Sequence, residues 1–288
     1  ENEKLLWEFQ EISHDIWNYD IASPPILTSI KKDDKLIDVV VVPTKFGNTL
    51  VLDRKTGNNI FEYANVKVPL SNVPGEKTSY YQKIFSLPEP FSNLFFDESH
   101  ITDLSKKSYD TVKEKIKDAS YGVFVPNSIN QKNIIYKGGA QWMGASIDNN
   151  NSIMYLTSND IPFMIWLEKI DTLDYYAYSL NTEFLEDHLG YPGSKPPWGR
   201  LSSIDLNTGK KIWEVPFGEY EELTKQGIPK TGTYNFGGVT GTAGGLLFAT
   251  GALDNKVSAF DSSNGKELWS FKMSHSGSNP PTIFEHLD

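Results

Sequence analysis

The chain alternates between short apolar runs and short polar segments over its whole length. The densest apolar run is residues 39–42. Residues 145–147 and 153–157 form two more runs, joined by the polar turn 148–151. Apolar runs of this kind between clusters of Asn, Asp and Gly are typical of β-strands. The pattern therefore predicts a chain built mainly from β-strands and turns.

A repeat of eleven residues connects some of these strands in pairs. Each copy has an apolar pair, an Asp, a turn with Gly, and an aromatic residue eight positions after the Asp. The Asp and the aromatic residue are Asp53 and Phe61, Asp205 and Trp213, and Asp261 and Trp269. Residues 4–7, which end in Trp7, resemble the tail of a fourth copy. Each copy predicts a hairpin whose first strand ends at the Asp and whose second strand carries the aromatic residue.

The spacing of the repeats indicates a β-propeller. Trp7 and Phe61 are about 55 residues apart, as are Trp213 and Trp269, and one unit of this length is typical of a propeller blade with loops. We expect the three repeats to lie in superimposable four-stranded blades, with Phe61, Trp213 and Trp269 in equivalent buried sites. Each aromatic ring should pack flat between neighbouring sheets, and each Asp should cap its turn. Independent hairpins in a β-sandwich are the alternative, but they predict no fixed step between Asp and aromatic residue.

Two insertions interrupt the repeats. The first covers about residues 66–120, in which the Pro- and Ser-rich part 66–99 predicts a long irregular loop. Within the same insertion, residues 106–117 predict a short amphipathic surface helix, because apolar residues recur there at helical spacing among charged ones. The second insertion covers about residues 167–197. We therefore expect residues 1–288 to form one partial propeller domain with these two insertions.

Composition excludes some classes of function. The 288 residues include 27 Lys and Arg against 37 Asp and Glu, and the net charge of −10 argues against a nucleic acid or an anionic membrane as partner. The chain has no Cys, so disulfides and thiolate metal sites are excluded. No apolar run approaches the roughly 18 residues that a membrane span needs. Because the chain begins at Glu1 without Met or a signal peptide, we expect a segment of a longer protein.

Two polar clusters near the N-terminus are candidate sites. Residues 14–20 combine two aromatic residues with polar and acidic ones, including Asn18 and Asp20. A turn closed by Asx hydrogen bonds is the simpler interpretation of such a cluster. Lys45 follows the apolar run 39–42. Its charge needs an anion or a carbonyl group as partner if it is buried, and otherwise the side chain extends to solvent.

Two further clusters occur later in the chain. Asn159 lies in the polar segment after the predicted strand 153–157. The glycine-rich segment 235–245 contains no Gly-Lys-Ser/Thr and is followed by a predicted strand rather than a helix, so it does not match a phosphate-binding loop. Its glycines predict a close approach of the backbone to a flat ligand or to a neighbouring blade.

The repeat and the clusters together resemble one known family, the PQQ-dependent (quinoprotein) dehydrogenases, and within it the branch of membrane-bound quinoprotein glucose dehydrogenase. The motifs that carry the resemblance follow in family order and cover nearly the whole chain: WEFQEISHDIWNYD (7–20), VVPTKFGNTLVLDRKTG (41–57), SNVPGE (71–76), GGAQWMG (138–144), PPWGRLSSIDLNTG (196–209), NFGGVTGTAGG (235–245) and AFDSSNGKELW (259–269).

The resemblance implies an eight-bladed propeller with tryptophan-docking motifs, of which this chain would supply about five blades. It also implies PQQ stacked near the central axis and a divalent ion, Ca²⁺ or Mg²⁺, that bridges cofactor and protein. Lys45 is implied as the cationic group at the quinone oxygens and Asn159 as a polar side chain lining the cofactor. Trp142 and Gly238 lie in segments that approach the cofactor plane in the family.

The chain departs from the family at the catalytic position. The family's catalytic Asp corresponds to Asn18, and an amide cannot accept a proton at neutral pH. Asp20 corresponds to a position where some members carry a further metal-binding carboxylate. The resemblance thus implies Asn18, Asp20 and Lys45 at the catalytic centre, with Asn18 and Asp20 as metal ligands.

Two functions are compatible with these residues. The first is a segment of a periplasmic dehydrogenase that oxidises a sugar or polyol and passes electrons to a quinone or cytochrome, with membrane attachment only through a segment preceding Glu1. The second is a catalytically silent propeller that serves as a scaffold. Lys45 and Asn159 favour the enzyme, whereas Asn18 favours the silent propeller.

Overall fold

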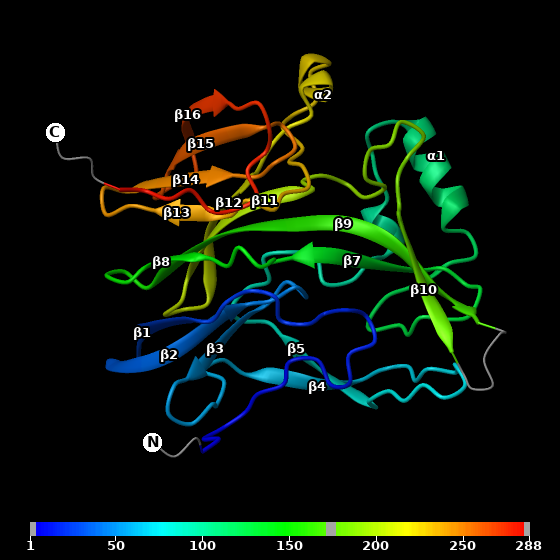
Figure 1. Cartoon of the computed structure of the whole chain (residues 1–288), viewed down its shortest axis with the longest axis horizontal. Coiled ribbons are helices and arrows are strands. Elements are labelled where there is room, and N and C mark those ends of the chain that lie inside the picture. The colour runs from blue at the N-terminus through cyan, green and yellow to red at the C-terminus, as the bar shows by residue number, and fades with distance from the viewer. Residues whose placement is uncertain (1–3, 171–176, 285–288) are drawn as a thin grey trace.

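The computed structural model describes residues 4–170 and 177–284 and consists mainly of antiparallel sheets. Figure 1 shows these sheets following one another from the N-terminal strands in blue to the C-terminal strands in orange and red. The strands of the first half are β1 (Ile26–Lys32), β2 (Lys35–Pro43), β3 (Thr49–Asp53), β4 (Tyr63–Lys67), β5 (Tyr81–Phe85), β6 (Ser120–Tyr121), β7 (Asn133–Gly139) and β8 (Ser146–Asp148). Those of the second half are β9 (Ile153–Lys169), β10 (Tyr178–Phe184), β11 (Gly199–Asp205), β12 (Lys210–Pro216), β13 (Val239–Gly241), β14 (Leu246–Thr250), β15 (Lys256–Asp261) and β16 (Glu267–Lys272).

The predicted hairpins are present at Asp205 (β11–β12) and Asp261 (β15–β16) but not at Asp53, where Phe61 lies outside the strands, and the sheets around the repeats differ. The repeat at Asp261 lies in the four-stranded sheet β13-β14-β15-β16, and that at Asp205 lies in β8, β9, β11 and β12, which pair in this order within a larger sheet. The repeat at Asp53 has only the three strands β1-β2-β3, so uniform four-stranded blades are a wrong prediction there. In place of a fourth strand, the Asn59 side chain accepts a hydrogen bond from Val51 N and donates one to Phe61 O.

Three of the aromatic residues pack on the turn glycine of the repeat that follows them. Trp7 lies against Gly57, Phe61 against Gly209 and Trp213 against Gly265, so closely that an added Cβ would lie 2.6, 3.0 and 2.6 Å from the respective ring atoms. The indole nitrogens of Trp7 and Trp213 also donate to the backbone carbonyls of Arg54 and Ser262. The repeat therefore joins consecutive sheets, as the docking interpretation requires.

Trp269 differs from the other docking residues. We expected Phe61, Trp213 and Trp269 in equivalent buried sites, but Trp269 is 51% exposed whereas Phe61 is 7% exposed. The reason is geometric: each ring docks on the repeat that follows it, and no repeat follows Trp269 within the 288 residues. The turn Asp residues behave as expected, since Asp53, Asp205 and Asp261 each accept hydrogen bonds from backbone N–H groups within their own turns.

Strand β9 is much longer than the predicted strand 153–157. It runs for 17 residues, pairing with β8 and β11 in its first part and with β7 and β10 in its second. Asn159 and Asp160 lie where the pairing changes from one set of partners to the other. One strand thus belongs to two neighbouring parts of the sheet, and its middle is buried beneath the candidate site.

The insertions are more regular than the sequence indicated. The segment 66–99 was expected to be an irregular loop, but it forms the hairpin β4–β5 together with residues just before it. The predicted helix is confirmed as α1 (Lys106–Lys115), which Ser105 caps by accepting a hydrogen bond from Ser108 N. A 3-10 turn (Glu98–His100) and α2 (Glu221–Lys225) complete the helices of the described residues, and none of them is long and apolar enough to cross a bilayer.

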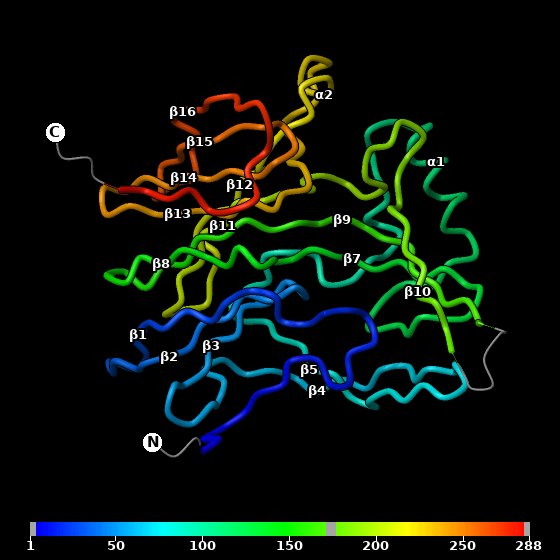
Figure 2. The backbone as a smooth tube through the Cα atoms, viewed as in Figure 1, coloured from blue at the N-terminus to red at the C-terminus, as the bar shows by residue number. Residues whose placement is uncertain are grey.

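The segment before β1 has no regular structure, yet it is firmly held along β5. The Gln82 side chain accepts a hydrogen bond from Ser13 N and donates one to Ser13 O, and Lys83 Nζ donates to Gln10 O. Figure 2 shows this segment in blue passing β4 and β5 before it reaches β1. Its course brings residues 14–20 towards the middle of the molecule.

Candidate functional site

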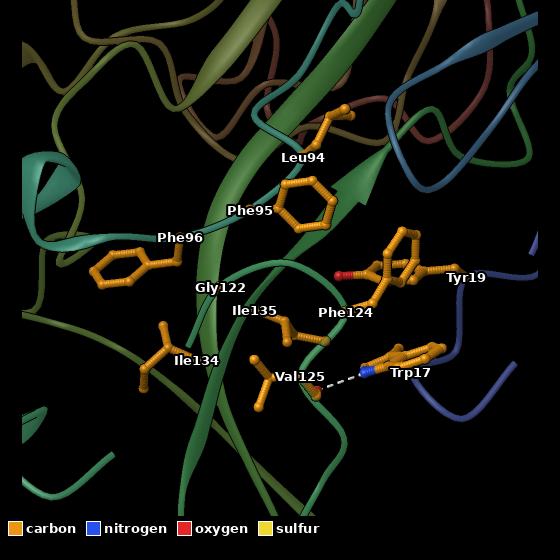
Figure 3. A pocket seen from close by; sticks show the side chains of 10 residues that line it. All are labelled: Trp17, Tyr19, Leu94, Phe95, Phe96, Gly122, Phe124, Val125, Ile134 and Ile135. Carbon is orange, nitrogen blue, oxygen red and sulfur yellow. Dashed lines mark hydrogen bonds between the residues drawn. The ribbon is translucent and has the colours of Figure 1, made fainter. Parts of the chain in front are cut away.

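Two buried aromatic residues fix the acidic cluster near the N-terminus. Trp17 and Tyr19 are buried, and Trp17 Nε1 donates to Val125 O at 2.7 Å. Figure 3 shows both rings directed towards Phe124, against which Trp17 packs edge-on at 5.2 Å. The residues between and after them, Asn18 and Asp20, are exposed. This alternation of buried and exposed side chains presents Asn18 and Asp20 on one side of the segment.

Lys45 meets this cluster from the turn that follows β2. Its Nζ lies 2.5 Å from Asp20 Oδ1 and 3.4 Å from Asn18 Oδ1. The Lys45 side chain is 16% exposed and that of Asp20 is 58% exposed. A lysine so largely covered requires an anionic partner, and Asp20 supplies it. The structure thus brings together three residues that the sequence placed in two separate motifs.

A cavity of about 230 Å³ opens beside Lys45. Its wall is formed by Asn18, Tyr19, Lys45, Lys137, Gly138, Gln141, Trp142, Phe163, Tyr234 and Phe236. Trp142 and Phe236 stack with ring centres 5.2 Å apart and planes 14° apart, and Tyr234 packs edge-on against Phe236. Trp142 is 58% exposed, so the aromatic wall remains accessible. The cavity combines aromatic faces with two lysine ammonium groups, which suits a flat anionic molecule.

Asn159 and Gly238 lie next to this cavity rather than in its wall. Asn159 is buried, and its Oδ1 accepts from Asn235 N and Nδ2 while its Nδ2 donates to Asn235 O. It supports the wall directly, since an added Cβ at Gly138 would lie 2.5 Å from Asn159 Cβ. Gly238 has φ +75° and packs on Met143, the residue after Trp142. Both residues therefore shape the segments that line the cavity.

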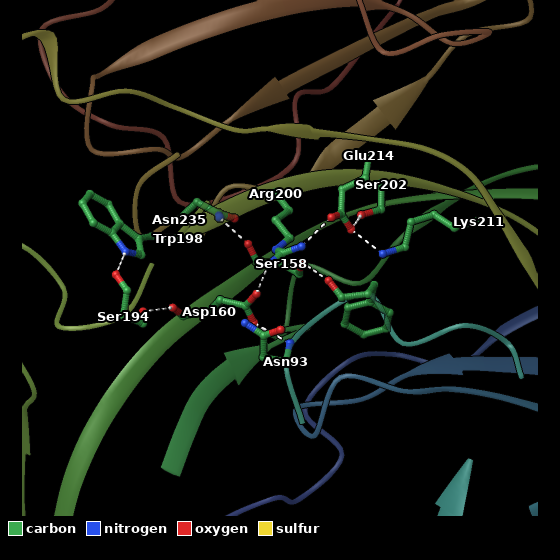
Figure 4. Close-up of polar contacts among 11 residues, drawn as sticks. Asn93, Ser158, Asp160, Ser194, Trp198, Arg200, Ser202, Lys211, Glu214 and Asn235 are labelled. Atoms are coloured by element: carbon green, nitrogen blue, oxygen red, sulfur yellow. Dashed lines mark hydrogen bonds and ion pairs between the residues drawn. The ribbon is translucent and has the colours of Figure 1, made fainter. Parts of the chain in front are cut away.

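A buried ionic network lies behind Asn159. Asp160 is completely buried, its Oδ1 accepts from Asn93 N, and Arg200 approaches its Oδ2 at 2.6 Å (Figure 4). Arg200 also pairs with Glu214, which in turn accepts from Lys211 at 2.6 Å. Burial raises the pKa of Asp160 to about 6, although the Arg200 charge opposes this shift. The network ties β9 to β11 and β12 beneath the site.

A second buried carboxyl group lies beneath the turn of Lys45. Glu11 Oε1 accepts hydrogen bonds from Thr44 Oγ1 at 3.0 Å and from Asn48 Nδ2 at 2.9 Å. Its other oxygen has no partner in the described residues. Burial raises the pKa of Glu11 to about 7, against the opposing effect of these two hydrogen bonds. Glu11 thus holds both ends of the turn that presents Lys45.

Asn18 and Asp20 do not form a metal site by themselves. They offer three side-chain oxygens, of which Asn18 Oδ1 and Asp20 Oδ1 already accept hydrogen bonds from the Lys45 ammonium group. Calcium takes six to eight oxygen ligands, and the described residues contain no cluster of three or more His, Asp or Glu side chains able to hold a metal. The donor set present here therefore does not fit a metal ion without further ligands.

The sequence did not identify several residues of this site. Lys137, Tyr234 and Phe236 line the cavity and Glu11 supports it, yet none of them was a candidate. Lys137 could have been selected from the sequence, because a lysine within an otherwise apolar strand is unusual. Nothing in the sequence marks the aromatic residues 234 and 236 as part of the site, since their role depends on which distant segment they meet.

The family of the chain follows from its match to known proteins. The family model described as "PQQ: Glucose/ethanol/alcohol dehydrogenase, beta-propeller domain" matches residues 2–288. The chain belongs to the PQQ dehydrogenase β-propeller family. Its propeller fold and its resemblance to quinoprotein glucose dehydrogenases, both expected from the sequence, are thereby confirmed.

The chain is similar to several members of the PQQ dehydrogenase family that are named for different substrates. Quinoprotein glucose dehydrogenase A of Acinetobacter calcoaceticus is 26% identical, over 98% of this chain and 39% of its own length. The large subunit of glycerol dehydrogenase of Gluconobacter thailandicus is 29% identical, over 97% and 43%. The quinate/shikimate dehydrogenase (quinone) of Acinetobacter baylyi is 26% identical, over 94% and 37%. The chain thus spans about two-fifths of the length of these relatives.

Solved structures show the same fold. Quinohemoprotein alcohol dehydrogenase from Comamonas testosteroni has a TM-score of 0.58 at 19% identity, covering 96% of this chain and 34% of its own. A europium-containing methanol dehydrogenase has a TM-score of 0.55 at 19% identity, covering 92% and 37%. At these identities the likeness establishes the propeller arrangement of the PQQ dehydrogenase family and nothing about substrate.

Proposed function

We propose that the complete protein is a PQQ-dependent dehydrogenase that oxidises a sugar or polyol and passes the electrons to a quinone or cytochrome. The observation that carries the proposal is the convergence of Asn18, Lys45 and Trp142, from three separate motifs, on one cavity. The names of its relatives, which include glucose and glycerol dehydrogenases, support a sugar or polyol as substrate. We further propose a periplasmic location and a Ca²⁺ or Mg²⁺ ion completed by ligands beyond those described.

The residues of the cavity fit PQQ, a planar tricarboxylate. Trp142 and Phe236 offer stacked aromatic faces, and Lys45 and Lys137 offer positive charge. When bound, PQQ would supply a quinone that accepts the hydride equivalent of the alcohol. In this arrangement Trp142 orients the plane of the cofactor, and Lys45 stabilises negative charge at its edge. Asp20, which is ion-paired with Lys45, keeps that ammonium group in place.

Proton transfer is the step for which this chain is least equipped. Oxidation of an alcohol needs an acceptor for the hydroxyl proton, and the amide of Asn18 cannot serve at neutral pH. Water, His14 and Asp20 are the alternatives, and Asp20 is the carboxylate that lies next to Asn18 and contacts Lys45. A catalytically silent propeller remains the second candidate function, because Asn18 is the observation that favours it.

Reconstitution of the complete protein tests the proposal. The protein is incubated with PQQ and CaCl₂ and assayed for dye reduction with glucose, glycerol and quinate, against a sample without PQQ and against Lys45→Ala. We expect PQQ to bind. We also expect dye reduction at a low rate, and this activity should require both PQQ and Lys45. Binding of PQQ without turnover of any substrate would support the silent propeller, and absence of PQQ binding would refute both the cofactor and the enzyme assignment.

A further inference from the structure

Lys137 is a second cation in the cavity, and no carboxylate of the described residues pairs with it. It lies on β7, where its backbone pairs with Ile161 of β9, and its partly buried side chain forms part of the cavity wall. Its Nζ sits 5.3 Å from the centre of the Phe163 ring. Within residues 4–170 and 177–284, Lys137 forms no ion pair with a carboxylate, unlike Lys45, which is paired with Asp20. The contact with Phe163 therefore keeps the ammonium group inside the cavity without neutralising it.

The charge on Lys137 is costly at this position. Burial, and next the positive charge of Lys45, lower the pKa of Lys137. The other wall residues are neutral, and of the two lysines only Lys45 forms an ion pair with a carboxylate of the described residues, that of Asp20. A partly desolvated cation that is repelled by its neighbour gains most from an anion placed beside it. The cavity is thus electrostatically incomplete until it holds a negatively charged ligand.

The position of Lys137 separates its role from that of Lys45. Lys45 is directed at Asn18 and Asp20, on the side where the acidic cluster lies. Lys137 contacts Phe163 and precedes Gly138, whose missing side chain lets β7 lie directly on Asn159. A flat ligand stacked on Trp142 would meet these two ammonium groups at different points of its edge.

We propose that Lys137 is a second cationic anchor of the cofactor site, which binds a carboxylate of PQQ while Lys45 serves the reacting end. This inference rests on the proposed function, because it takes PQQ as the ligand. It assigns Lys137 to cofactor affinity and orientation, not to the chemical step. A carboxylate beside Lys137 replaces the contact with Phe163 by a charge-assisted hydrogen bond.

Equilibrium dialysis of the complete protein with PQQ in CaCl₂ measures this role directly, without any need for activity. Lys137→Gln is compared with wild type, with Lys137→Arg, and with Lys107→Gln, which removes one positive charge from an exposed position of α1. We expect Lys137→Gln to weaken PQQ binding about 10- to 100-fold, the value of a hydrogen bond to a charged group. Lys137→Arg should stay within a few-fold of wild type, and Lys107→Gln should not differ from it.

The trimethyl ester of PQQ separates a carboxylate contact from a merely structural effect. Because the ester has no negative charge, wild type and Lys137→Gln should bind it equally. An equal loss for PQQ and its ester would overturn the proposal in favour of a structural role, as would unchanged PQQ binding by Lys137→Gln. Failure of the wild type itself to bind PQQ would refute the proposed function together with this inference, so the two failures are distinguishable.

Discussion

Single residues in this protein derive their roles from burial as much as from chemical type. Asn18 and Asp20 project towards Lys45 because Trp17 and Tyr19 on either side of Asn18 are buried in an aromatic cluster. Asn18 itself has φ +66°, a left-handed conformation that Asn and Asp tolerate better than most other residues. The same backbone could therefore carry Asp at this position without added strain.

Replacing Asn18 by Asp tests whether the missing base limits turnover. We expect Asn18→Asp to raise PQQ-dependent dye reduction by about 10²–10⁴-fold, the usual contribution of general-base assistance. Asp20→Ala is the companion variant, because Asp20 holds Lys45. Vigorous wild-type activity that disappears in Asp20→Ala would show instead that Asp20 is the base and that Asn18 is no obstacle.

Glu11 gives the protein a predictable dependence of stability on pH. Its pKa of about 7 in the folded protein lies above the ordinary 4.5, so the folded state holds the proton more tightly than the unfolded state does. The free energy of unfolding should therefore fall as pH rises from about 4.5 to 7, and the loss is complete above pH 7. A raised pKa of this size corresponds to about 3 kcal/mol.

Glu11→Gln removes this ionisation while its amide oxygen can still accept from Thr44 and Asn48. The free energy of unfolding of the variant is compared with that of wild type by urea unfolding at pH 5 and at pH 8. We expect this difference to shift by about 3 kcal/mol in favour of the variant between the two pH values, because only the wild type loses stability as Glu11 ionises. Glu62→Gln, at an exposed position, is the matched control. A difference between wild type and Glu11→Gln that does not change with pH would contradict a buried, titrating carboxyl group.

The residue scale also shows what the sequence could reveal about the site. Lys45, Asn18 and Asp20 could be found because each stands in a motif that keeps its residues close along the chain. Lys137 and Glu11 could not, because their importance lies in a missing counter-ion and in burial beneath a distant turn. Neither property is visible until β7, β9 and the N-terminal segment are placed in space.

At the scale of elements, β9 explains the main error in strand prediction. The polar residues Asn159 and Asp160 suggested the end of a strand, but both are buried and fully engaged in polar contacts within it. Hydrophobic patterning detects strands with one apolar face and fails where a strand carries buried polar residues that are paired. The hairpin β4–β5 was missed for a related reason, since its β4 residues are largely exposed.

Arg200 should be the residue on which this part of the sheet most depends. It bridges Asp160 on β9 and Glu214 on β12 from its own position on β11. Arg200→Met removes the cationic partner of both Asp160 and Glu214, so the buried Asp160 carboxyl group must remain unpaired or take up a proton, and we expect a loss of about 3–5 kcal/mol in the free energy of unfolding. The measurement is urea unfolding at neutral pH.

Two further variants decide whether the ion pair is the cause. Asp160→Asn combined with Arg200→Met should cost less than the sum of the single changes, because no unpaired charge remains at Asp160. Lys210→Met breaks the exposed pair with Glu89 and should cost at most about 1 kcal/mol. Strict additivity of Asp160→Asn and Arg200→Met would mean that the two side chains act independently.

At the scale of the whole molecule, the docking residues connect the sheets in series. Phe61 joins the first sheet to the turn of β11–β12, and Trp213 joins that sheet to the turn of β15–β16. This order and the propeller fold could be predicted, because every eleven-residue repeat contains both an aromatic residue and a turn glycine, the two groups that meet between consecutive repeats. The uneven number of strands could not be predicted, because after Asp53 only short backbone contacts and the Asn59 side chain stand where the other two repeats have a paired strand.

Serial connection gives the last sheet, β13–β16, one docking ring, Trp213, beside the apolar core that the sheet shares with Tyr155 and Leu201. Trp213 contacts Gly265 and donates to Ser262 O, and β16 itself leaves Leu268, Trp269 and Phe271 exposed. Trp213→Ala should therefore cost about 3–5 kcal/mol, as the truncation of a large packed aromatic residue does. Because Trp213 packs against the apolar cluster that lies between this sheet and β9 and β11, the loss should be largest at that boundary and should appear as easier opening of β13–β16, not as uniform destabilisation.

Native-state hydrogen exchange can resolve this opening element by element. In Trp213→Ala, the backbone amides of β14 and β15 should exchange with a free energy lowered by about 3–5 kcal/mol, whereas those in the middle of β9 should keep their protection. Ile212→Ala, which changes the exposed neighbour of Trp213 on β12, provides the control and should alter neither group. Equal loss of protection in β9 and β14 would instead mean that the sheets unfold as one cooperative unit, in which docking stabilises the propeller as a whole.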